Sequence, residues 1–246
     1  MSMFTVAPDL AGIVRPGVLW LEGATVTEAD ARLDAPLAEI AQRFRLKPEA
    51  TDSGKLEATD SGKLEATDSG KPEATDSGKP EATDSGGFRL QAEVRTMYKR
   101  VGIDPTKRRP SSEALLRRVR KGEPLPRINS MVDVCNWCSL EFQLPYGLYD
   151  ADRIEGDVVL RIGLDGESYA GIRKDEVHVG GRITLADRVG PFGNPTSDSA
   201  RTMVTTATVR ALIVVFAPIE VERRRVDHVL AVTAERMQMF TGARTI

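Results

Sequence analysis

The stretch RRPSSEALLRRVRKGEPLPRINSMVDVCNWCSLEFQLPYGLYD, residues 108–150, decides the fold of this chain. It starts with two arginines, continues through two short helix signals and ends in a turn rich in proline, glycine and aromatic residues. Ser111 and Ser112 follow Pro110 and can cap a first helix, because serine hydroxyls accept hydrogen bonds from the free amides of a first turn. Gly122 is predicted to end that helix.

A second helix is predicted from Ser130 to about Phe142. Ser130 and Asp133 have the spacing of a capping box, in which a hydroxyl and a carboxylate satisfy the free amides of the first turn. Cys135 and Asn136 lie in the middle of this helix, and Gly147 lies in the turn that follows it.

The part before this stretch predicts strands and then helices. Two short strands are expected at residues 4–6 and 18–24, divided by Pro16 and Gly17. From Thr27, which can act as a cap, apolar residues recur at helical spacing as far as Phe44, with a bend or restart at Pro36. Another amphipathic helix is expected from about Phe88 to a stop at Gly102.

The part after this stretch predicts an antiparallel sheet and a last helix. Strands are expected at residues 157–161, 167–172, 182–186, 202–209 and 211–216, separated by loops that contain glycine. The last of these is a continuous apolar run suited to a buried strand. A final helix is expected over residues 222–240. The fold class is therefore α+β, with a mainly antiparallel, sandwich-like sheet and packed helices.

Five copies of the octapeptide K-[PL]-E-A-T-D-S-G occupy residues 47–86. Each copy carries a charge of −1, so the array contributes −5. The formal net charge of the whole chain is −2, so the remainder of the chain carries +3. Repeats of fixed period can stack into a solenoid, but these lack a repeated apolar stripe. We expect a disordered acidic insertion, since such a segment buries too little surface to offset its ordering entropy.

Length and composition indicate one domain with its own core. Residues 1–46 are expected to pack on the main domain of residues 87–246, and the long insertion between them is tolerable because the closure cost grows only with the logarithm of loop length. No apolar run approaches a membrane span, and the N-terminus lacks the pattern of a secretion signal. We expect a cytoplasmic protein without membrane contact.

Cys135 and Cys138 form a C-x-x-C motif in the second predicted helix. Half a zinc site and a redox pair are two interpretations, but His178 and His228 are the only histidines and they lie far apart. The interpretation we adopt is two small, semi-apolar side chains on a helix, with no metal and no cofactor.

Several pieces of the sequence resemble the B3/B4 domain of phenylalanyl-tRNA synthetase β chains, and more closely the free-standing bacterial proteins made of that domain alone. The pieces occur in the same order between about Val94 and Pro218: RPSSEALLRRV, LPRIN, VDVCN, LPYGLYD, DRIEGDVVLR and TLAD. In the synthetases this domain binds the end of a mischarged tRNA and hydrolyses the wrong amino acid from it.

The resemblance implies a substrate pocket with three departures. Asn136 matches the asparagine of a Thr-Asn pair that lines the synthetase editing pocket, whereas Cys135 replaces the threonine. Gly147 stands where the synthetases have a histidine, which implies more space beside Asn136 and Tyr149. Leu212 stands where they have a glutamate that recognises a substrate hydroxyl, which makes that wall apolar. These departures argue against tyrosine-rejecting specificity.

Other polar residues near this site have two interpretations, a local structural role or a function in the pocket. For Asp150 and Asp187, turn capping at the ends of strands and helices is the favoured interpretation. Asp198, Arg201 and Thr202 lie in a loop rich in proline and glycine, where a function in the pocket is favoured.

A run of cations gives a candidate RNA surface. Residues 99–127 hold ten lysines and arginines against three acids. Such a run is often only a solvated helix face, and the resemblance is what favours RNA. The candidate phosphate contacts are Lys107, Arg108, Arg109, Arg117, Arg118, Arg120, Lys121 and Arg127.

The leading hypothesis is a free-standing domain that binds tRNA or aminoacyl-tRNA, with no DNA partner, and that hydrolyses a mischarged species in trans. The spacing of residues in the sequence indicates no pair of nucleophile and general base. We therefore expect attack by a water molecule that Asn136 and backbone amides orient, rather than a covalent intermediate. The alternatives are a non-catalytic module for an amino-acid-like molecule or a protein partner, and an interaction protein built on the repeats.

Overall fold

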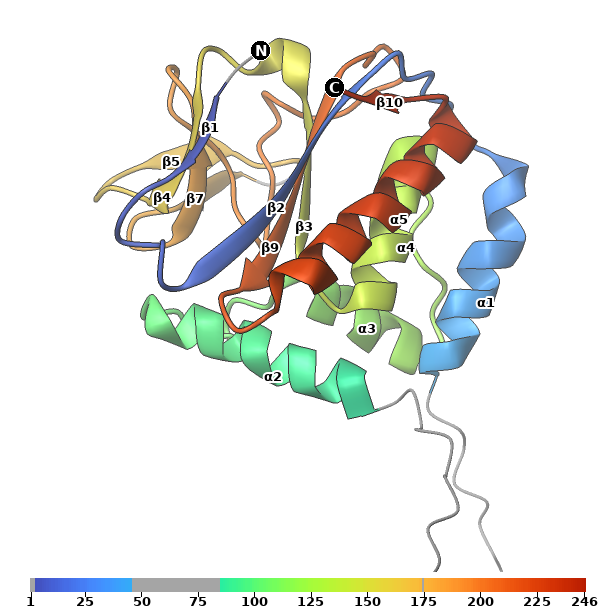
Figure 1. The fold of residues 1–246 in the computed structure, drawn as a ribbon, viewed down its shortest axis with the longest axis horizontal. Coiled ribbons are helices and arrows are strands. Elements are labelled where there is room, and N and C mark those ends of the chain that lie inside the picture. Colours follow the sequence, from blue (N-terminus) through green and yellow to red (C-terminus); the bar gives the residue numbers. More distant parts are fainter. Residues whose placement is uncertain (1–2, 46–84, 174) are drawn as a thin grey trace, which may run out of the picture.

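Two four-stranded sheets face each other, and helices cover the outer side of one of them (Figure 1). The computed structural model describes residues 3–45, 85–173 and 175–246. The fold is α+β with mainly antiparallel pairing, as the sequence predicts. The expected disordered array, residues 47–86, lies outside the described residues except for its last two positions, which begin a helix.

The sheet next to the helices has the strand order β10-β2-β9-β3. Its members are β10 (Arg244–Thr245), β2 (Val14–Glu22), β9 (Ala211–Pro218) and β3 (Tyr146–Asp150). All eight residues of β9 are buried, because it lies between two strands and both of its faces are covered. The apolar run of residues 211–216 is thus confirmed as a buried strand.

The division of β2 at Pro16 and Gly17 was a wrong expectation, since both residues lie inside one continuous strand. Pro16 is opposite Phe216, and β10 pairs only with Glu22 and Leu21, so the proline can lack an amide donor without breaking a ladder. Gly17 has a packing role: a Cβ atom there would lie 2.9 Å from the Leu230 side chain. The glycine lets a helix approach the sheet closely.

The second sheet has the order β1-β4-β7-β8, and only β1 and β4 are parallel. Its strands are β1 (Phe4–Val6), β4 (Val158–Ile162), β7 (Ile183–Ala186) and β8 (Pro191–Gly193). A small hairpin, β5 (Ser168–Ala170) with β6 (Glu176–His178), extends from it. Strands were predicted close to β1, β4, β5 and β7, whereas β3, β6, β8 and β10 were not expected.

The predicted strand at residues 202–209 is wrong, because this segment is a series of turns. Its threonine side chains bind nearby amides: Thr205 N donates to the Thr208 hydroxyl over 3.0 Å, and Ala207 N donates to the Thr205 hydroxyl over 3.2 Å. Local side-chain hydrogen bonds of this kind compete with a strand ladder.

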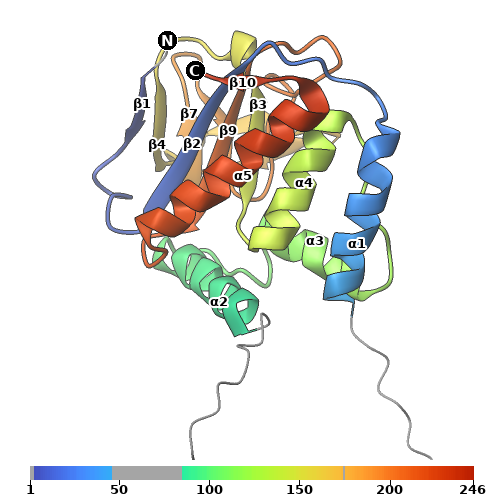
Figure 2. The same ribbon diagram turned by 45° about the vertical axis from the view of Figure 1, so that its right-hand side comes forward.

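Two helices pack directly on the first sheet, α4 (Ser130–Phe142) and α5 (Arg223–Thr241). Helix α1 (Asp34–Phe44) packs outside them against α4 and α3 (Ser111–Arg120), while α2 (Ser85–Arg100) contacts the end of β9. Figure 2 shows that the end of α1 and the start of α2 lie on the same side of the molecule. The predicted helices agree with α2, α3, α4 and α5 within a few residues, whereas the helix expected from Thr27 begins as α1 only at Asp34, with Pro36 in its first turn.

The expected serine caps are wrong by one position. Pro110 precedes α3 without a side-chain cap, and Ser111 is already the first helical residue. Asn129 caps α4 by accepting a hydrogen bond from Val132 N over 2.9 Å. Ser130 instead accepts from the backbone amide of Thr27 over 3.1 Å, so Thr27 is not a cap either.

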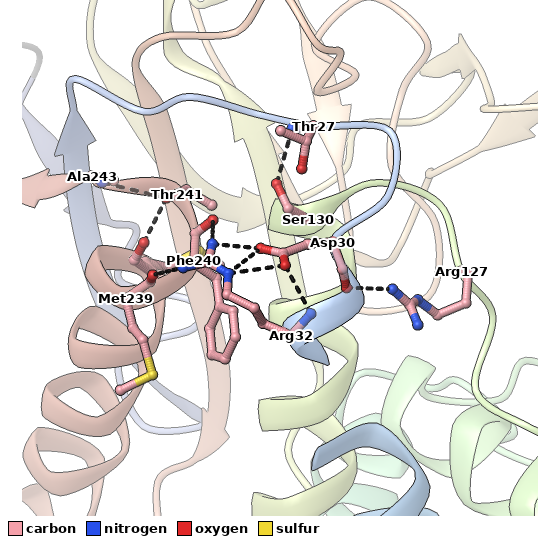
Figure 3. A network of polar contacts seen from close by, with 10 residues as sticks. Thr27, Asp30, Arg32, Arg127, Ser130, Met239, Phe240, Thr241 and Ala243 are labelled. Atoms are coloured by element: carbon pink, nitrogen blue, oxygen red, sulfur yellow. Dashed lines mark hydrogen bonds and ion pairs between the residues drawn. The ribbon is translucent and has the colours of Figure 1, made fainter. Parts of the chain in front are cut away.

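A polar network fastens the first helical turn to the end of α5 (Figure 3). Asp30 caps the short 3-10 helix η1 (Ala31–Leu33) and forms an ion pair with Arg32. The Arg32 guanidinium donates to the carbonyl oxygens of Met239 and Phe240 over 3.1 and 3.3 Å. A cation at the carbonyl end of a helix is favourable, so this contact holds the N-terminal part on the core.

Candidate functional site

A cavity of about 660 Å³ lies between α3, α4, β3 and the loops at residues 172–173 and 196–204. Helix α4 contributes one face to it, with Val132, Cys135, Asn136 and Ser139 at the spacing i, i+3, i+4, i+7. The strand contributes Tyr146 and Leu148, and the loop contributes Asp198. The predicted pocket residues Cys135, Asn136 and Asp198 therefore meet in one hollow.

Asn136 is half-buried on the wall of this cavity, and its side chain makes no hydrogen bond to the part of the chain that the structure describes. Cys135 is buried, and burial raises the pKa of its thiol well above the ordinary value, with smaller contributions from Cys138 and Asp198. A thiol held in its neutral form is a poor nucleophile. Asn136 is thus the side chain best placed to contact a ligand.

A second hollow of about 370 Å³ lies beside this cavity and is also lined by cationic side chains. It is lined by the predicted cations Lys107, Arg108 and Arg109, and also by Arg182. Ser111, Ala114 and Thr196 line both this hollow and the large cavity. The cationic surface and the cavity are therefore continuous, and we call the two together the groove.

The other predicted RNA contacts divide into two groups. Arg117, Arg118 and Lys121 line the large cavity, although Arg118 also pairs with Glu123 over 3.1 Å. Arg120 and Arg127 line neither hollow. Arg127 is held by Asp133 over 2.7 Å and by Asp34, so its charge is compensated within the fold.

Gly147, Tyr149 and Leu212 lie on the other face of β3 and β9, away from the large cavity. Tyr149 is opposite Leu212 in the sheet, and both side chains are fully buried. The Tyr149 ring packs edge-on against Phe192 of the facing sheet, with ring centroids 5.0 Å apart. Burial, followed by the Asp198 carboxylate, raises the pKa of Tyr149 well above its ordinary value.

The expectation that Gly147 leaves open space is wrong. A Cβ atom at this position would lie 2.1 Å from the Tyr149 hydroxyl oxygen, and one at Gly193 would lie 2.3 Å from it. The tyrosine ring therefore occupies the volume above both glycines. The missing side chain at position 147 is replaced by an aromatic ring from two residues further along the strand.

Arg201 and Thr202, also predicted for the pocket, are engaged inside the protein. Arg201 donates two hydrogen bonds of 2.9 Å to the buried carboxylate of Asp187. Burial raises the pKa of Asp187, but Arg201 and backbone amides lower it, and the net shift is downward. The hydroxyl of Thr202, which is buried, lies 3.2 Å from that of Ser199.

The capping interpretation of two aspartates is confirmed. Asp150 accepts from the amide of Asp152 over 3.0 Å at the start of a 3-10 helix. Asp187 accepts from the amides of Val189 and Gly190 over 3.0 and 3.2 Å. Both carboxylates satisfy turn amides, as aspartates in turns commonly do.

Arg182 was not predicted for the site. It precedes β7 and reaches the hollow from the second sheet, whereas the predicted cations that line this hollow, Lys107, Arg108 and Arg109, come from the loop before α3. Its only signal in the sequence was the glycine pair before it, which indicates a tight turn. Nothing in the spacing shows that this turn meets the loop at residues 107–109.

Cys135 and Cys138 are both buried, free thiols. Within the described ranges, no group of three or more His, Cys, Asp and Glu side chains could hold a metal ion. No helix in that part of the chain has the length and apolar character needed to cross a membrane.

Comparison with known proteins gives one family. A family model described as "B3/4 domain" matches residues 93–238. A similar solved structure is an N-terminal fragment of the phenylalanyl-tRNA synthetase β-subunit from Pyrococcus horikoshii, with 14% sequence identity and a TM-score of 0.44. The alignment covers 99% of this chain and 50% of that chain, so the present chain spans about half the length of the fragment. No curated protein matches the sequence.

Proposed function

This chain belongs to the B3/4 domain family, and on that premise we propose that it binds the aminoacylated end of a tRNA as a free-standing domain. The aminoacyl group occupies the large cavity, and the RNA backbone lies along the cationic hollow. The observation that carries the proposal is the continuity of the groove: Ser111, Ala114 and Thr196 line both parts. A ligand with a compact end and a polyanionic backbone fits such a surface.

Two side chains in the cavity have chemistry that suits an aminoacyl group. The Asn136 amide has two N–H donors and a carbonyl acceptor, which can bind an ester carbonyl or a ribose hydroxyl. The Asp198 carboxylate lines the same cavity and would attract the α-ammonium group of an amino acid. Together they would fix the ester bond between them.

The second step of the proposal is hydrolysis by water. A water molecule attacks the ester carbonyl carbon, the bond between that carbon and the ribose oxygen breaks, and the ribose oxygen takes a proton from the water. The products are the free amino acid and the ribose hydroxyl. The Asn136 amide would donate to the oxygen that becomes negative, a contribution typically worth a factor of about 10² to 10³ in rate. No acyl-enzyme forms in this scheme. Such a protein would act in the cytoplasm.

A second candidate function is non-catalytic binding of an amino-acid-like molecule or a protein partner at the same groove. The observation that favours it is the sealed position of Gly147 and Leu212, where the synthetases have a histidine and a glutamate. The third hypothesis is an interaction protein, in which the repeats of residues 47–86 themselves bind a partner.

The test offers the purified full chain a panel of misacylated tRNAs and measures both binding and loss of the ester. We expect Asn136→Ala to slow hydrolysis by about a hundredfold while deacylated tRNA still binds within about twofold, because the hollow is unchanged. The double variant Arg108→Ala/Arg109→Ala is expected to weaken binding of every tRNA. If four cations meet phosphates, the logarithm of affinity should fall against that of salt concentration with a slope of about −3.

The outcomes separate the hypotheses. Ester loss that survives both sets of substitutions comes from another site or a contaminant. Binding without ester loss selects the non-catalytic module. A salt-insensitive complex contradicts binding through the hollow, and loss of binding on deletion of residues 47–84 favours the repeat array.

A further inference from the structure

We propose that Arg108 and Arg182 form a phosphate subsite at the mouth of the groove. The identity of the phosphate, a backbone phosphate of bound RNA, rests on the proposed function. The existence of the subsite rests only on the residues around it.

The two arginines come from separate parts of the chain and meet in one place. Arg108 lies in the loop before α3, and Arg182 lies directly before β7. Both line the hollow of about 370 Å³, and both line a smaller one beside it with Ile183 and Thr196. The hollow is large enough for a phosphodiester with part of its sugar.

Neither guanidinium has a hydrogen bond or an ion pair with any residue in the described ranges. Most other arginines in the second sheet and its loops do: Arg161 binds Glu167 over 2.6 Å, and Arg201 binds Asp187 over 2.9 Å. An arginine presents five N–H donors in a planar fork that matches phosphate oxygens. Two such forks facing one hollow are suited to an anion with several oxygens.

The two charges also oppose each other. Burial, and then the neighbouring Arg108 guanidinium, lowers the pKa of Arg182, so holding both cations together costs free energy in the unliganded protein. One acid lines the same hollow, Glu176, but it accepts a hydrogen bond from the Ser168 hydroxyl and lies 3.8 Å from His178 Nε2. An anion between the arginines would remove their repulsion.

Neutral donors face the same place. The ten-residue helix α3 begins at Ser111 without a side-chain cap, and the positive end of its dipole adjoins the hollow. The Ser111 hydroxyl oxygen is shielded from solvent and has no hydrogen-bond partner in the described part of the chain. An unpaired buried hydroxyl is unfavourable, and a phosphate oxygen would satisfy it.

The first arm of the test needs no RNA. Inorganic phosphate is titrated into the full chain and followed by ³¹P NMR, with chloride at matched ionic strength as the reference. Arg182→Gln and Arg108→Gln are each expected to weaken phosphate binding by roughly tenfold or more, the usual effect of losing a charged hydrogen bond. Arg182→Lys, which keeps the charge, should lose less.

The second arm measures thermal unfolding and tRNA binding of the same variants. Without phosphate, Arg182→Gln should unfold at a temperature no lower than the parent, because one of two repelling charges is gone. A merely structural arginine would lower it. Arg188→Gln is the matched control, since Arg188 lies at the other end of β7 and pairs with Glu155 on the exposed surface. It should bind phosphate and tRNA as the parent does.

The results distinguish failure of the subsite from failure of the proposed function. Phosphate binding that Arg182→Gln and Arg108→Gln leave unchanged overturns the subsite. Equal tRNA affinity and salt dependence in the parent and Arg182→Gln overturn the assignment of the bound anion as an RNA backbone phosphate, while RNA binding elsewhere in the groove stands. Phosphate binding that both substitutions abolish, in a protein that binds no tRNA, supports the subsite and rejects the proposed function.

Discussion

The two faces of strand β3 lie in opposite surroundings. Tyr146 and Leu148 point toward the helices and line the large cavity. Gly147 and Tyr149 point toward the second sheet, where the Tyr149 ring packs against Phe192 and is fully buried. One strand of five residues therefore separates an open groove, lined by both apolar and polar side chains, from a closed, apolar interior.

This contrast explains how the predicted pocket residues divide. Asn136 lies on the open side, whereas Gly147, Tyr149 and Leu212 lie on the closed side. The Asp198 carboxylate lines the open cavity and also acts on the buried Tyr149 hydroxyl. A pocket that used both sets would need β3 to expose both of its faces at once. In the described structure the space beside Gly147 and Leu212 is filled by the protein's own side chains, whereas the groove on the other side of β3 is open.

The largest expected effect comes from placing an acid on the closed side. Leu212→Glu puts a carboxylate at a position with 0% exposure, next to Tyr149. We expect a loss of about 4 kcal/mol in the free energy of unfolding, because a buried charge without a partner is strongly unfavourable. The loss should shrink at low pH, where the introduced group is neutral. Urea unfolding at two pH values measures both.

Leu212→Met is the control, since a volume-conserving apolar exchange costs under about 1.5 kcal/mol. A stable Leu212→Glu variant that gains affinity for a ligand with a hydroxyl group would mean that the closed side can open. That result would remove the distinction between the two faces.

A smaller effect is expected from Arg201→Ala, which leaves the buried Asp187 carboxylate without its cation. The loss should be about 3 kcal/mol at neutral pH. Because Arg201 and nearby amides hold the pKa of Asp187 below 3.8 against the effect of burial, this contribution is present above that pH and is lost as pH falls through the folded value. The deficit of the variant should therefore narrow in acid.

Unfolding curves between pH 3 and 7 follow this narrowing. Since Arg201 stabilises the fold and lies outside the groove, the affinity of the folded variant for tRNA should match that of the parent. Loss of tRNA affinity with an unchanged free energy of unfolding would instead mean that Arg201 contacts the ligand, as the sequence alone suggested.

The sequence predicts the parts of the fold whose signals are long and local. Helices α4 and α5 have an apolar period over several turns, and β9 is a continuous apolar run, so their positions were predicted within a few residues. Strand β3 has no such pattern, because its pairing with β9 decides its state. The threonines of residues 202–209 have high strand propensity, but their hydroxyls bind local amides instead.

The candidate site follows the same division. Asn136 and the cations at residues 107–109 lie on one continuous segment, so sequence reasoning could place them together. Arg182 reaches the hollow only because a turn of the second sheet packs beside that segment. The closed side was misread for a similar reason: the sequence shows a missing side chain at Gly147, but it does not show that Tyr149 folds back over it.

The smallest of the three effects tests this last contact directly. Gly147→Ala adds one carbon atom 2.1 Å from the Tyr149 hydroxyl oxygen and 2.6 Å from Cζ, so the ring must move within a packed interior. We expect a loss of about 2 kcal/mol, typical of overpacking. Gly12→Ala is the control: no atom lies within 4 Å of its added carbon, so its effect should stay within about 0.5 kcal/mol.

A double-mutant cycle with Tyr149→Leu separates the steric contact from any effect on the backbone of β3. Shortening the side chain at position 149 removes the atoms that the new carbon would strike. The loss of unfolding free energy in the double variant should therefore be smaller than the sum of the two separate losses, by at least about 1 kcal/mol. Strict additivity would mean that the alanine is accommodated elsewhere, and the two faces of β3 would then be less independent than their surroundings indicate.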